Sequence, residues 1–166
     1  MFASLFKPLF HLLVGFWLAG CASPPVFSPQ VTLPQSTGRL TQDKRHDVVM
    51  QSMAMLDRGY TYGGKKLHTG FDCSGLVSFV YKNAAGLDLR GSSADMAAKT
   101  RPIQSQAAMP GDLVFFNTRG AAFSHVGIYI GSGKFIHAAN ERTGVKQERL
   151  DSTYWAKRFE GFRVLD

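Results

Sequence analysis

The sequence predicts a single α+β domain, with its helices first and an antiparallel sheet after them. Between residues 41 and 99, apolar side chains recur at helical spacing. After Pro110-Gly111 they gather in short strand-like segments that glycine-containing turns separate. The chain has 166 residues and no internal repeat, which favours one compact domain over residues 41–166.

Residues 1–20 predict a lipoprotein signal peptide. Lys7 precedes an apolar run from Leu9 to Ala19, a layout that is typical of a secretory signal. The run is about half of the ~20 apolar residues that a transmembrane helix needs. Leu18-Ala19-Gly20-Cys21 resembles the bacterial lipobox, in which the signal is cut before a cysteine and the cysteine is acylated. We therefore expect lipidation at Cys21; an ordinary secretory signal with a chance cysteine is the alternative.

Residues 21–40 predict a lipidated cysteine followed by an extended tether. This segment holds four of the seven prolines of the chain and shows no helical or alternating period. Ala22 stands where an aspartate favours retention at the inner membrane. We therefore expect a bacterial cell-envelope protein whose lipid anchor lies in the outer membrane and faces the periplasm.

Three helices are predicted in the first half of the domain. The first begins near Thr41 and ends at Gly59, because its apolar residues fall on one face. After a glycine-containing loop, the second begins at Cys73 and has Gly86 as its C-cap. The third is short and runs through Ala94–Lys99 after a serine.

The sequence of the second half of the domain predicts strands over residues 112–116, 125–130 and 134–139. It also predicts a helical turn over 154–159 and a closing strand over 161–165.

Cys73 is the candidate nucleophile. It begins a predicted helix directly after Asp72, and the unpaired N–H groups and positive dipole of a helix start lower the pKa of a thiol. Because the thiolate is the reactive form, this position favours catalysis. With Cys21 the chain has two cysteines, too few for a disulfide scaffold. A small buried core residue is the alternative interpretation of Cys73.

Two histidines on neighbouring predicted strands, His125 and His137, add to this candidate site. Because side chains alternate along a strand, the turn decides whether the two share a face. A two-residue Ser132-Gly133 turn places them on opposite faces. A three-residue loop over 131–133 pairs Gly127 with His137 and makes the histidines diagonal neighbours. A catalytic pair therefore requires the three-residue loop or an equivalent bulge, with Gly127 leaving room for the nucleophile helix.

Together these residues resemble the NlpC/P60 family of cell-wall cysteine peptidases. The resemblance lies in YTYGG, FDCSGLV, PGDLVFF and SHVGIYIGSGKFIHA, in that chain order. It covers about residues 41–166 and implies a papain-like fold, a lipoprotein endopeptidase, and no cofactor or metal. The implied substrates are the amide bonds of peptidoglycan stem peptides.

The resemblance also implies catalytic roles by position. Cys73 is then the nucleophile, His125 the general base and acid, and His137 the residue that orients the imidazole. Tyr60 resembles the family tyrosine whose hydroxyl helps to bind the oxyanion. The loop before the cysteine is one residue longer than the family pattern, which makes Tyr62 the competing position.

Three further residues lie where some family members contact the peptide of the substrate. These are Asp72, Ser74 and Ser92, which we expect to bind substrate. Asp95 stands where the family pattern has a glutamine after the serine motif.

Two other functions compete with a peptidase. One is a non-catalytic peptidoglycan-binding lipoprotein of the same fold. The other is a metal site, since one cysteine and two histidines could ligate zinc with His68 or Asp72 as the fourth ligand. The formal net charge is +7, or +6 once Lys7 leaves with the signal, and it is spread along the chain. We therefore expect no nucleic-acid binding, and we expect a monomer.

Overall fold

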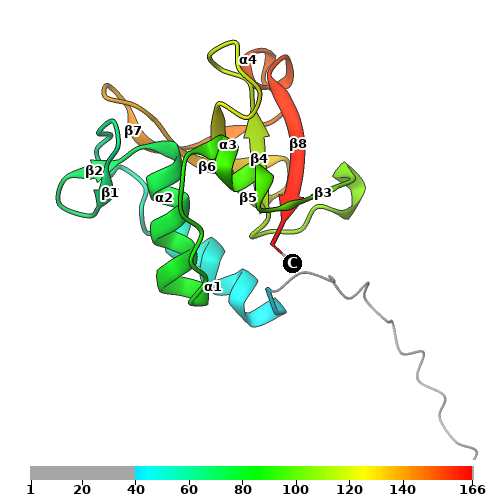
Figure 1. Ribbon diagram of the computed structural model, residues 1–166, viewed down its shortest axis with the longest axis horizontal. Coiled ribbons are helices and arrows are strands. Elements are labelled where there is room, and N and C mark those ends of the chain that lie inside the picture. The colour runs from blue at the N-terminus through cyan, green and yellow to red at the C-terminus, as the bar shows by residue number, and fades with distance from the viewer. Residues whose placement is uncertain (1–39, 166) are drawn as a thin grey trace, which may run out of the picture. The chain divides into compact units, whose positions relative to one another are not determined.

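The computed structural model describes residues 40–165 (Figure 1). The predicted signal over 1–20, the lipidation site at Cys21 and the tether up to residue 39 lie outside the described residues. Within 40–165, no helix combines the length and the apolar character needed to cross a bilayer.

The helices and strands follow the predicted order, helices first. They are α1 (Gln42–Met53), β1 (Lys65–Lys66), β2 (Gly70–Phe71), α2 (Cys73–Val80), the π-helical turn η1 (Tyr81–Ala85), α3 (Ser93–Ala98), β3 (Arg101–Ile103), the 3-10 turn η2 (Ser105–Ala107), β4 (Leu113–Phe116), β5 (His125–Gly131), β6 (Lys134–Asn140), β7 (Gly144–Arg149), α4 (Thr153–Ala156) and β8 (Phe159–Val164).

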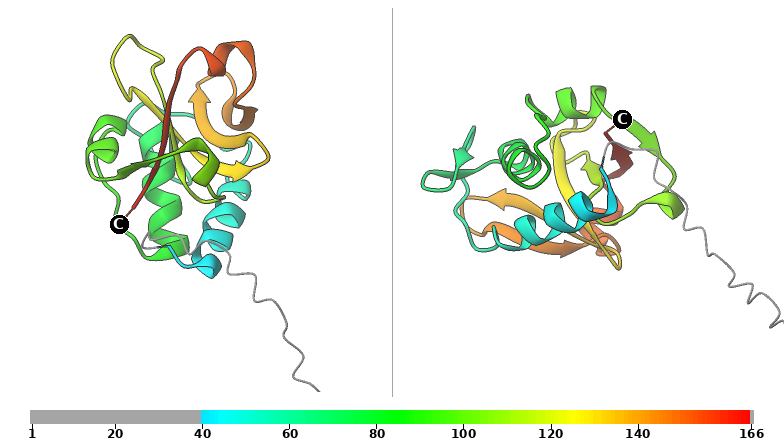
Figure 2. Two further views of the ribbon diagram at one scale, coloured as in Figure 1. Left: turned by 90° about the vertical axis from the view of Figure 1, so that its right-hand side faces the viewer. Right: turned by 90° about the horizontal axis from the view of Figure 1, so that it is seen from below.

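A six-stranded antiparallel sheet organises the domain, in the strand order β3-β8-β4-β5-β6-β7. The nucleophile helix α2 packs against β5 and β6, and α1 packs against η1, the continuation of α2 (Figures 1 and 2). The predicted α+β class, with the helix that begins at Cys73 packed on an antiparallel sheet, is confirmed.

Apolar side chains pack on both faces of this sheet. Val126 and Ile128 of β5 join the helices in the larger core. On the opposite face lies a smaller aromatic cluster, made of Val114, Phe116, Phe135, Trp155 and Phe162. Because alternate residues of a strand point to opposite faces, His125 shares the face of the aromatic cluster. The cysteine and the histidines therefore approach each other from different sides of β5.

The end of the nucleophile helix is also as predicted. After α2 the helical structure continues through η1 and ends at Gly86, which has a left-handed φ of 70°. The Tyr81 hydroxyl donates to the Gly111 carbonyl. The buried Arg45 guanidinium of α1 pairs with Asp112 at 2.6 Å. These two contacts hold the helices to the start of β4.

The register between β5 and β6 is the one that a catalytic pair requires, because Ile128 pairs with Ile136. A bulge at Ile130 provides it, rather than the three-residue loop. The turn itself is the two-residue Ser132-Gly133 turn, with φ values of 51° and 69°, as in a type I′ turn.

Gly127 leaves room for different neighbours than predicted. A Cβ there would lie 2.8 Å from Cδ2 of Phe135 and 3.4 Å from Cβ of His137. Glycine is therefore needed for the adjacent strand, not for the nucleophile helix. That helix meets the opposite face of β5, where Val126 lies.

Four strands were not predicted, namely β1, β2, β3 and β7. The β7 sequence GVKQER has one apolar residue, Val145, so it shows no alternation that would predict a strand. Pairing with β6 makes it a strand. The predicted helical turn over 154–159 is α4, and the closing strand begins at Phe159 rather than at Gly161.

Candidate active site

The nucleophile helix is fastened to the loop before it by one carboxylate. Asp72 is the N-cap of α2, and its Oδ1 accepts from the Gly75 N–H at 2.6 Å and from the Ser74 hydroxyl at 3.0 Å. Its Oδ2 accepts from the Gly63 N–H at 3.0 Å. The hydrogen bonds of one side chain thus fix both the start of α2 and the loop over it.

Close backbone packing explains two of the glycines in this region. A Cβ on Gly75 would lie 1.9 Å from the Gly64 carbonyl oxygen, which no rearrangement of side chains could relieve. The first turn of α2 and the double-glycine loop therefore contact each other directly. This contact places the loop beside Cys73.

The two histidines form a hydrogen-bonded pair on the sheet. Nε2 of His125 lies 2.7 Å from Nδ1 of His137, and the two rings are 8% and 1% exposed. The register of β5 and β6 therefore brings them together on one face, as predicted. Because this bond uses Nε2 of His125, Nδ1 is the ring nitrogen left for another partner.

Two pairs of tautomers satisfy this hydrogen bond. In one pair, Nε2 of His125 donates to Nδ1 of His137, which leaves Nδ1 of His125 without hydrogen and able to accept a proton. His137 then carries its hydrogen on Nε2. That atom is buried and has no hydrogen-bond partner among the described residues.

Trp155 covers both histidine rings. Its ring centroid lies 5.6 Å from that of His125 in a stacked arrangement and 4.8 Å from that of His137, edge to face. Phe116 and Phe135 pack around the same indole, at 4.7 Å and 5.1 Å. The histidine pair is thus enclosed by aromatic rings, and α4, which carries Trp155, comes from near the end of the chain.

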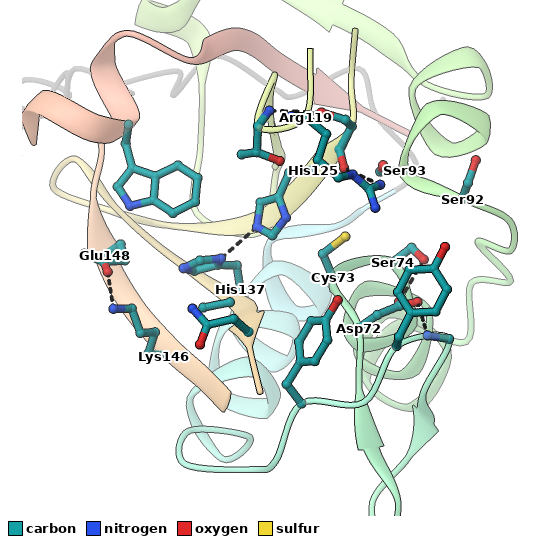
Figure 3. Close-up of a pocket in the computed structure, with 18 of the residues that line it drawn as sticks. Asp72, Cys73, Ser74, Ser92, Ser93, Arg119, His125, His137, Lys146 and Glu148 are labelled. Carbon is teal, nitrogen blue, oxygen red and sulfur yellow. Dashed lines mark hydrogen bonds and ion pairs between the residues drawn. The ribbon is translucent and has the colours of Figure 1, made fainter. Parts of the chain in front are cut away.

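One pocket joins the two halves of the site (Figure 3). It has a volume of about 860 Å³, and its lining includes every residue that the sequence proposed for catalysis or substrate binding: Tyr60, Asp72, Cys73, Ser74, Ser92, His125 and His137.

The thiol does not have the lowered pKa that its place at a helix start predicts. Burial raises the pKa of Cys73 above its ordinary value, and the Asp72 carboxylate raises it further. Hydrogen bonds from the backbone of Val126 and Ser74 lower the pKa, but by less than burial raises it. The expectation of a ready thiolate is therefore wrong for the resting site, because burial outweighs the helix start.

Burial acts on the histidines in the opposite direction. It lowers the pKa of His125 to about 4, with a smaller lowering from Arg119. Burial also lowers the pKa of His137 well below its ordinary value, and the neighbouring His125 lowers it further. The resting site therefore holds a neutral thiol beside two neutral imidazoles.

Tyr60 and Tyr62 both line the pocket, but Tyr60 is the more buried of the two. Tyr60 is half-buried and bridges to Phe71, whereas the Tyr62 side chain is 78% exposed. Burial raises the pKa of the Tyr60 hydroxyl, and Cys73 and Asp72 raise it further through their charges. Its hydroxyl thus remains protonated at neutral pH and can donate a hydrogen bond.

Ser74 and Ser92 reach the wall of the pocket with their hydroxyls already bonded. The Ser74 hydroxyl donates to Asp72. Ser92 is the N-cap of α3, and it forms a reciprocal capping box with Asp95. Asp95, which departs from the family pattern, is therefore the partner that completes this cap.

The arrangement disfavours the metal interpretation. In residues 40–165 no three histidine, cysteine, aspartate or glutamate side chains are grouped to hold a metal ion. The facing nitrogens of His125 and His137 are hydrogen-bonded to each other, and His68 is exposed in the loop between β1 and β2.

Sequence reasoning missed many residues of the pocket, among them Arg119, Lys146, Glu148 and Trp155. Lys146 and Glu148 form an ion pair at 2.5 Å on β7, a strand that was not predicted. Trp155 lies in the predicted helical turn, but no local pattern indicates that this turn folds over the histidines. Arg119 was detectable only as a basic residue in the loop before the strand of His125.

Comparisons with known proteins agree with this geometry. A sequence model described as the NlpC/P60 family matches residues 57–164. The chain is 37% identical over 120 residues to gamma-DL-glutamyl hydrolase of Bacillus subtilis (strain 168), covering 72% of this chain and 29% of that protein. It is 35% identical over 114 residues to murein DD-endopeptidase MepH of Escherichia coli (strain K12), covering 67% and 42%. The match thus spans less than half the length of either relative.

A solved structure shares the fold. It is a protein similar to lipoprotein, of the NLP/P60 family, from Staphylococcus aureus subsp. aureus Mu50. The TM-score is 0.68 at 30% identity, over 81% of this chain and 45% of that chain. Helices packed on a six-stranded antiparallel sheet are thus a shared, papain-like architecture.

Proposed function

The chain belongs to the NlpC/P60 family, and from that premise we propose that it is a cysteine peptidase that hydrolyses amide bonds of peptidoglycan stem peptides. One observation carries the proposal. Cys73, at the start of a helix, opens into the same pocket as the hydrogen-bonded His125–His137 pair.

The first step of the proposed reaction forms a tetrahedral intermediate on Cys73. Sγ of Cys73 attacks the amide carbon while its proton passes to Nδ1 of His125, and the carbonyl electrons move to the oxygen. Because thiol and imidazole are both neutral at rest, His125 must take the proton of the thiol during this step. His137 holds the imidazole of His125 in position through the 2.7 Å bond.

The negative charge that develops on the carbonyl oxygen needs hydrogen-bond donors to stabilise it. The Cys73 N–H lies in the first turn of α2, where N–H groups have no intrahelical acceptor. The Tyr60 hydroxyl is the second donor. Loss of one such donor costs on the order of 10²–10³ in rate.

Release and hydrolysis reverse the proton transfer. As the C–N bond breaks, Nδ1 of His125 returns the proton to the leaving amine. A water then attacks the thioester and gives its proton to His125, and cleavage of the C–S bond restores the thiol. No cofactor takes part in the proposed reaction.

We place this enzyme in the bacterial cell envelope. The support for a lipid anchor is the sequence around Cys21, with the tether over 22–40 allowing the domain to reach the wall. An outer-membrane anchor facing the periplasm follows from Ala22. Cell fractionation of a Cys21→Ser variant tests this, because loss of acylation is expected to move the protein out of the membrane pellet.

The function itself is tested on purified sacculi. We expect the full-length chain to release fragments whose masses correspond to hydrolysed stem-peptide amides. Cys73→Ala is expected to abolish release while the melting temperature stays close to that of the wild type, because a smaller side chain fits at the helix start. Digestion that persists at the wild-type rate in this variant would contradict a cysteine peptidase.

Two arms of the same experiment separate the competing functions. A non-catalytic binding protein would sediment with sacculi but release nothing, in the wild type as in Cys73→Ala. A metal enzyme would lose activity with a chelator, whereas a thiol peptidase is expected to lose it with an alkylating agent.

A further inference from the structure

The positive charges of the pocket are not all balanced. Lys65, Arg119 and Lys146 line it together with two carboxylates. Glu148 pairs with Lys146, and Asp72 is occupied by its three hydrogen bonds at the start of α2. Within the described part of the chain, Arg119 and Lys65 face this pocket without a carboxylate partner.

Arg119 is held in place by the loop that carries it. The Ser124 hydroxyl accepts from the backbone N–H of Thr118 at 2.9 Å and of Arg119 at 3.2 Å. The loop is anchored further by Phe123, whose N–H donates to Glu160 at 2.5 Å and whose ring packs on Phe115. The base of the Arg119 side chain is therefore fixed by interactions that no substrate needs to provide.

The guanidinium points toward the reacting centre. Figure 3 shows the Arg119 side chain extending from its loop toward the space over Cys73. Its positive charge acts on the three groups that surround this space, because it lowers the pKa of Tyr60, of Cys73 and of His125. The space that these groups share is the space that a scissile amide must occupy.

Most of the guanidinium is free to bind a ligand. Among the described residues its single acceptor is the Ser124 carbonyl, at 3.1 Å from Nη2. Nε, Nη1 and the second hydrogen of Nη2 remain, so one of the two planar forks, Nη2 with Nε or Nη2 with Nη1, can still match a carboxylate. A lysine in the same place would offer charge without this geometry.

Stem peptides supply such a carboxylate next to a scissile amide. A glutamyl residue linked through its γ-carboxyl leaves its α-carboxylate free, and diaminopimelate has a second carboxyl beyond the one in the chain. Amidation converts either group to a neutral carboxamide. Both sources share one chemistry, a free carboxylate on a residue that flanks the scissile bond.

We propose that Arg119 binds this carboxylate and makes the enzyme selective for stem peptides that are not amidated. The proposal rests on the proposed peptidase function, which it deepens by naming the substrate form. Arg119 is thus a substrate-binding residue, on the wall of the pocket across from the loop of Tyr60.

The experiment compares kcat/KM of the full-length chain on three synthetic stem peptides. One has both carboxylates free, one is amidated at the glutamyl α-carboxyl, and one is amidated at the second carboxyl of diaminopimelate. We expect one amidation to lower kcat/KM of the wild type about 10- to 100-fold, the range for losing a charge-assisted hydrogen bond. The position that matters identifies the source of the carboxylate.

Arg119→Gln is expected to lower kcat/KM on the free peptide by the same factor and to remove the difference between the peptides. The lost charge also affects the thiol, but it does so for all peptides alike. The ratio of kcat/KM on the free peptide to kcat/KM on an amidated peptide therefore isolates the carboxylate contact. Arg119→Lys is expected to recover part of this ratio. Lys65→Gln removes one charge from the same pocket and is expected to leave the ratio unchanged.

Equal hydrolysis of all three peptides by the wild type would overturn the proposal, as would an unchanged ratio in Arg119→Gln. Both results leave the peptidase function standing. No hydrolysis of any peptide by the wild type would overturn the proposed function, and this inference with it.

Discussion

The two sides of the pocket are held by different kinds of interaction. On the helix side, short-range hydrogen bonds from Asp72 fix the start of α2 and the loop beside it. On the strand side, the His125–His137 pair depends on the pairing of β5 with β6 and on the cover that Trp155 provides from α4. The helix side is thus a local structure, whereas the strand side exists only in the complete fold.

The two sides also differ in whether their buried polar atoms have hydrogen-bond partners. Both carboxylate oxygens of Asp72 are hydrogen-bonded, whereas Nε2 of the buried His137 has no partner among residues 40–165. A buried polar atom without a partner costs stability. We expect the strand side to respond more strongly to mutation and to pH than the helix side.

The largest effect is expected for His137→Ala. Without the 2.7 Å bond the imidazole of His125 loses its orientation, and the side chain is replaced by a cavity under Trp155. We expect kcat/KM on stem peptides to fall about 10³-fold, within the range for losing general acid–base catalysis. His137→Asn returns a hydrogen-bonding group and is expected to recover about tenfold. Full activity in His137→Ala would show that the strand side does not position the base.

Acid is expected to destabilise the fold through the same histidines. The unfolded chain binds a proton at His125 with a pKa of 6.5, whereas the folded chain binds it only near pH 4. Between these values the unfolded state holds more protons, so stability is lost as pH falls from 6.5 to 4. For His125 alone the loss is about 3 kcal/mol, and the lowered pKa of His137 acts in the same direction.

Urea unfolding at pH 7 and at pH 4.5 measures this loss. The control is a variant in which both histidines are replaced by asparagine, because every other titrating group is retained. The free energy of unfolding of this variant is expected to change less with pH than that of the wild type. Parallel pH dependences in the two proteins would mean that the buried pair is not the source of the acid sensitivity.

Tyr60→Phe tests the donor that the loop on the helix side contributes. We expect kcat/KM to fall about 10²-fold, because the hydroxyl that we propose as an oxyanion donor is removed while the ring still packs. Tyr62→Phe is the matched control in the same loop, and it is expected to have little effect since this side chain is 78% exposed. The opposite ranking would assign the oxyanion donor to Tyr62.

The same contrast explains what the sequence could predict. The start of α2 at Cys73 and the end of its continuation η1 at Gly86 are set by local capping, and both were predicted correctly. Alternation along β5 and β6 predicted that the two histidines share a face. The sequence did not decide between a longer loop and a bulge, because both give the same offset beyond the turn; the structure has the bulge, at Ile130.

What the sequence could not predict depends on contacts between distant segments. Trp155 belongs to the site only because α4 folds over the sheet, and β7 is a strand only because β6 pairs with it. The pKa of Cys73 was predicted in the wrong direction because a sequence shows the helix start but not the burial. Arg119 reaches the pocket through a loop anchored by Ser124 and Phe123, which no spacing in the sequence indicates.

The smallest effect is expected for Asp72→Asn, and it separates the two roles of this residue. Asparagine keeps an oxygen for the Gly75 N–H but loses the negative charge at the helix start, so the free energy of unfolding is expected to fall by about 1 kcal/mol. Because the carboxylate raises the pKa of Cys73, its removal lowers that pKa. Alkylation by iodoacetamide at pH 7 is therefore expected to become faster while the fold becomes less stable.

Ser92→Ala is the matched control for this variant, because it removes the N-cap of α3 in the same pocket wall. A similar loss of stability with unchanged alkylation is expected, since Ser92 carries no charge that acts on the thiol. If Asp72→Asn left the alkylation rate at the wild-type value, the charge of Asp72 would not reach the thiol. The carboxylate would then act only as a cap. Faster alkylation together with slower peptide hydrolysis would instead show that Asp72 also contacts the substrate, the role that its position in the sequence predicts.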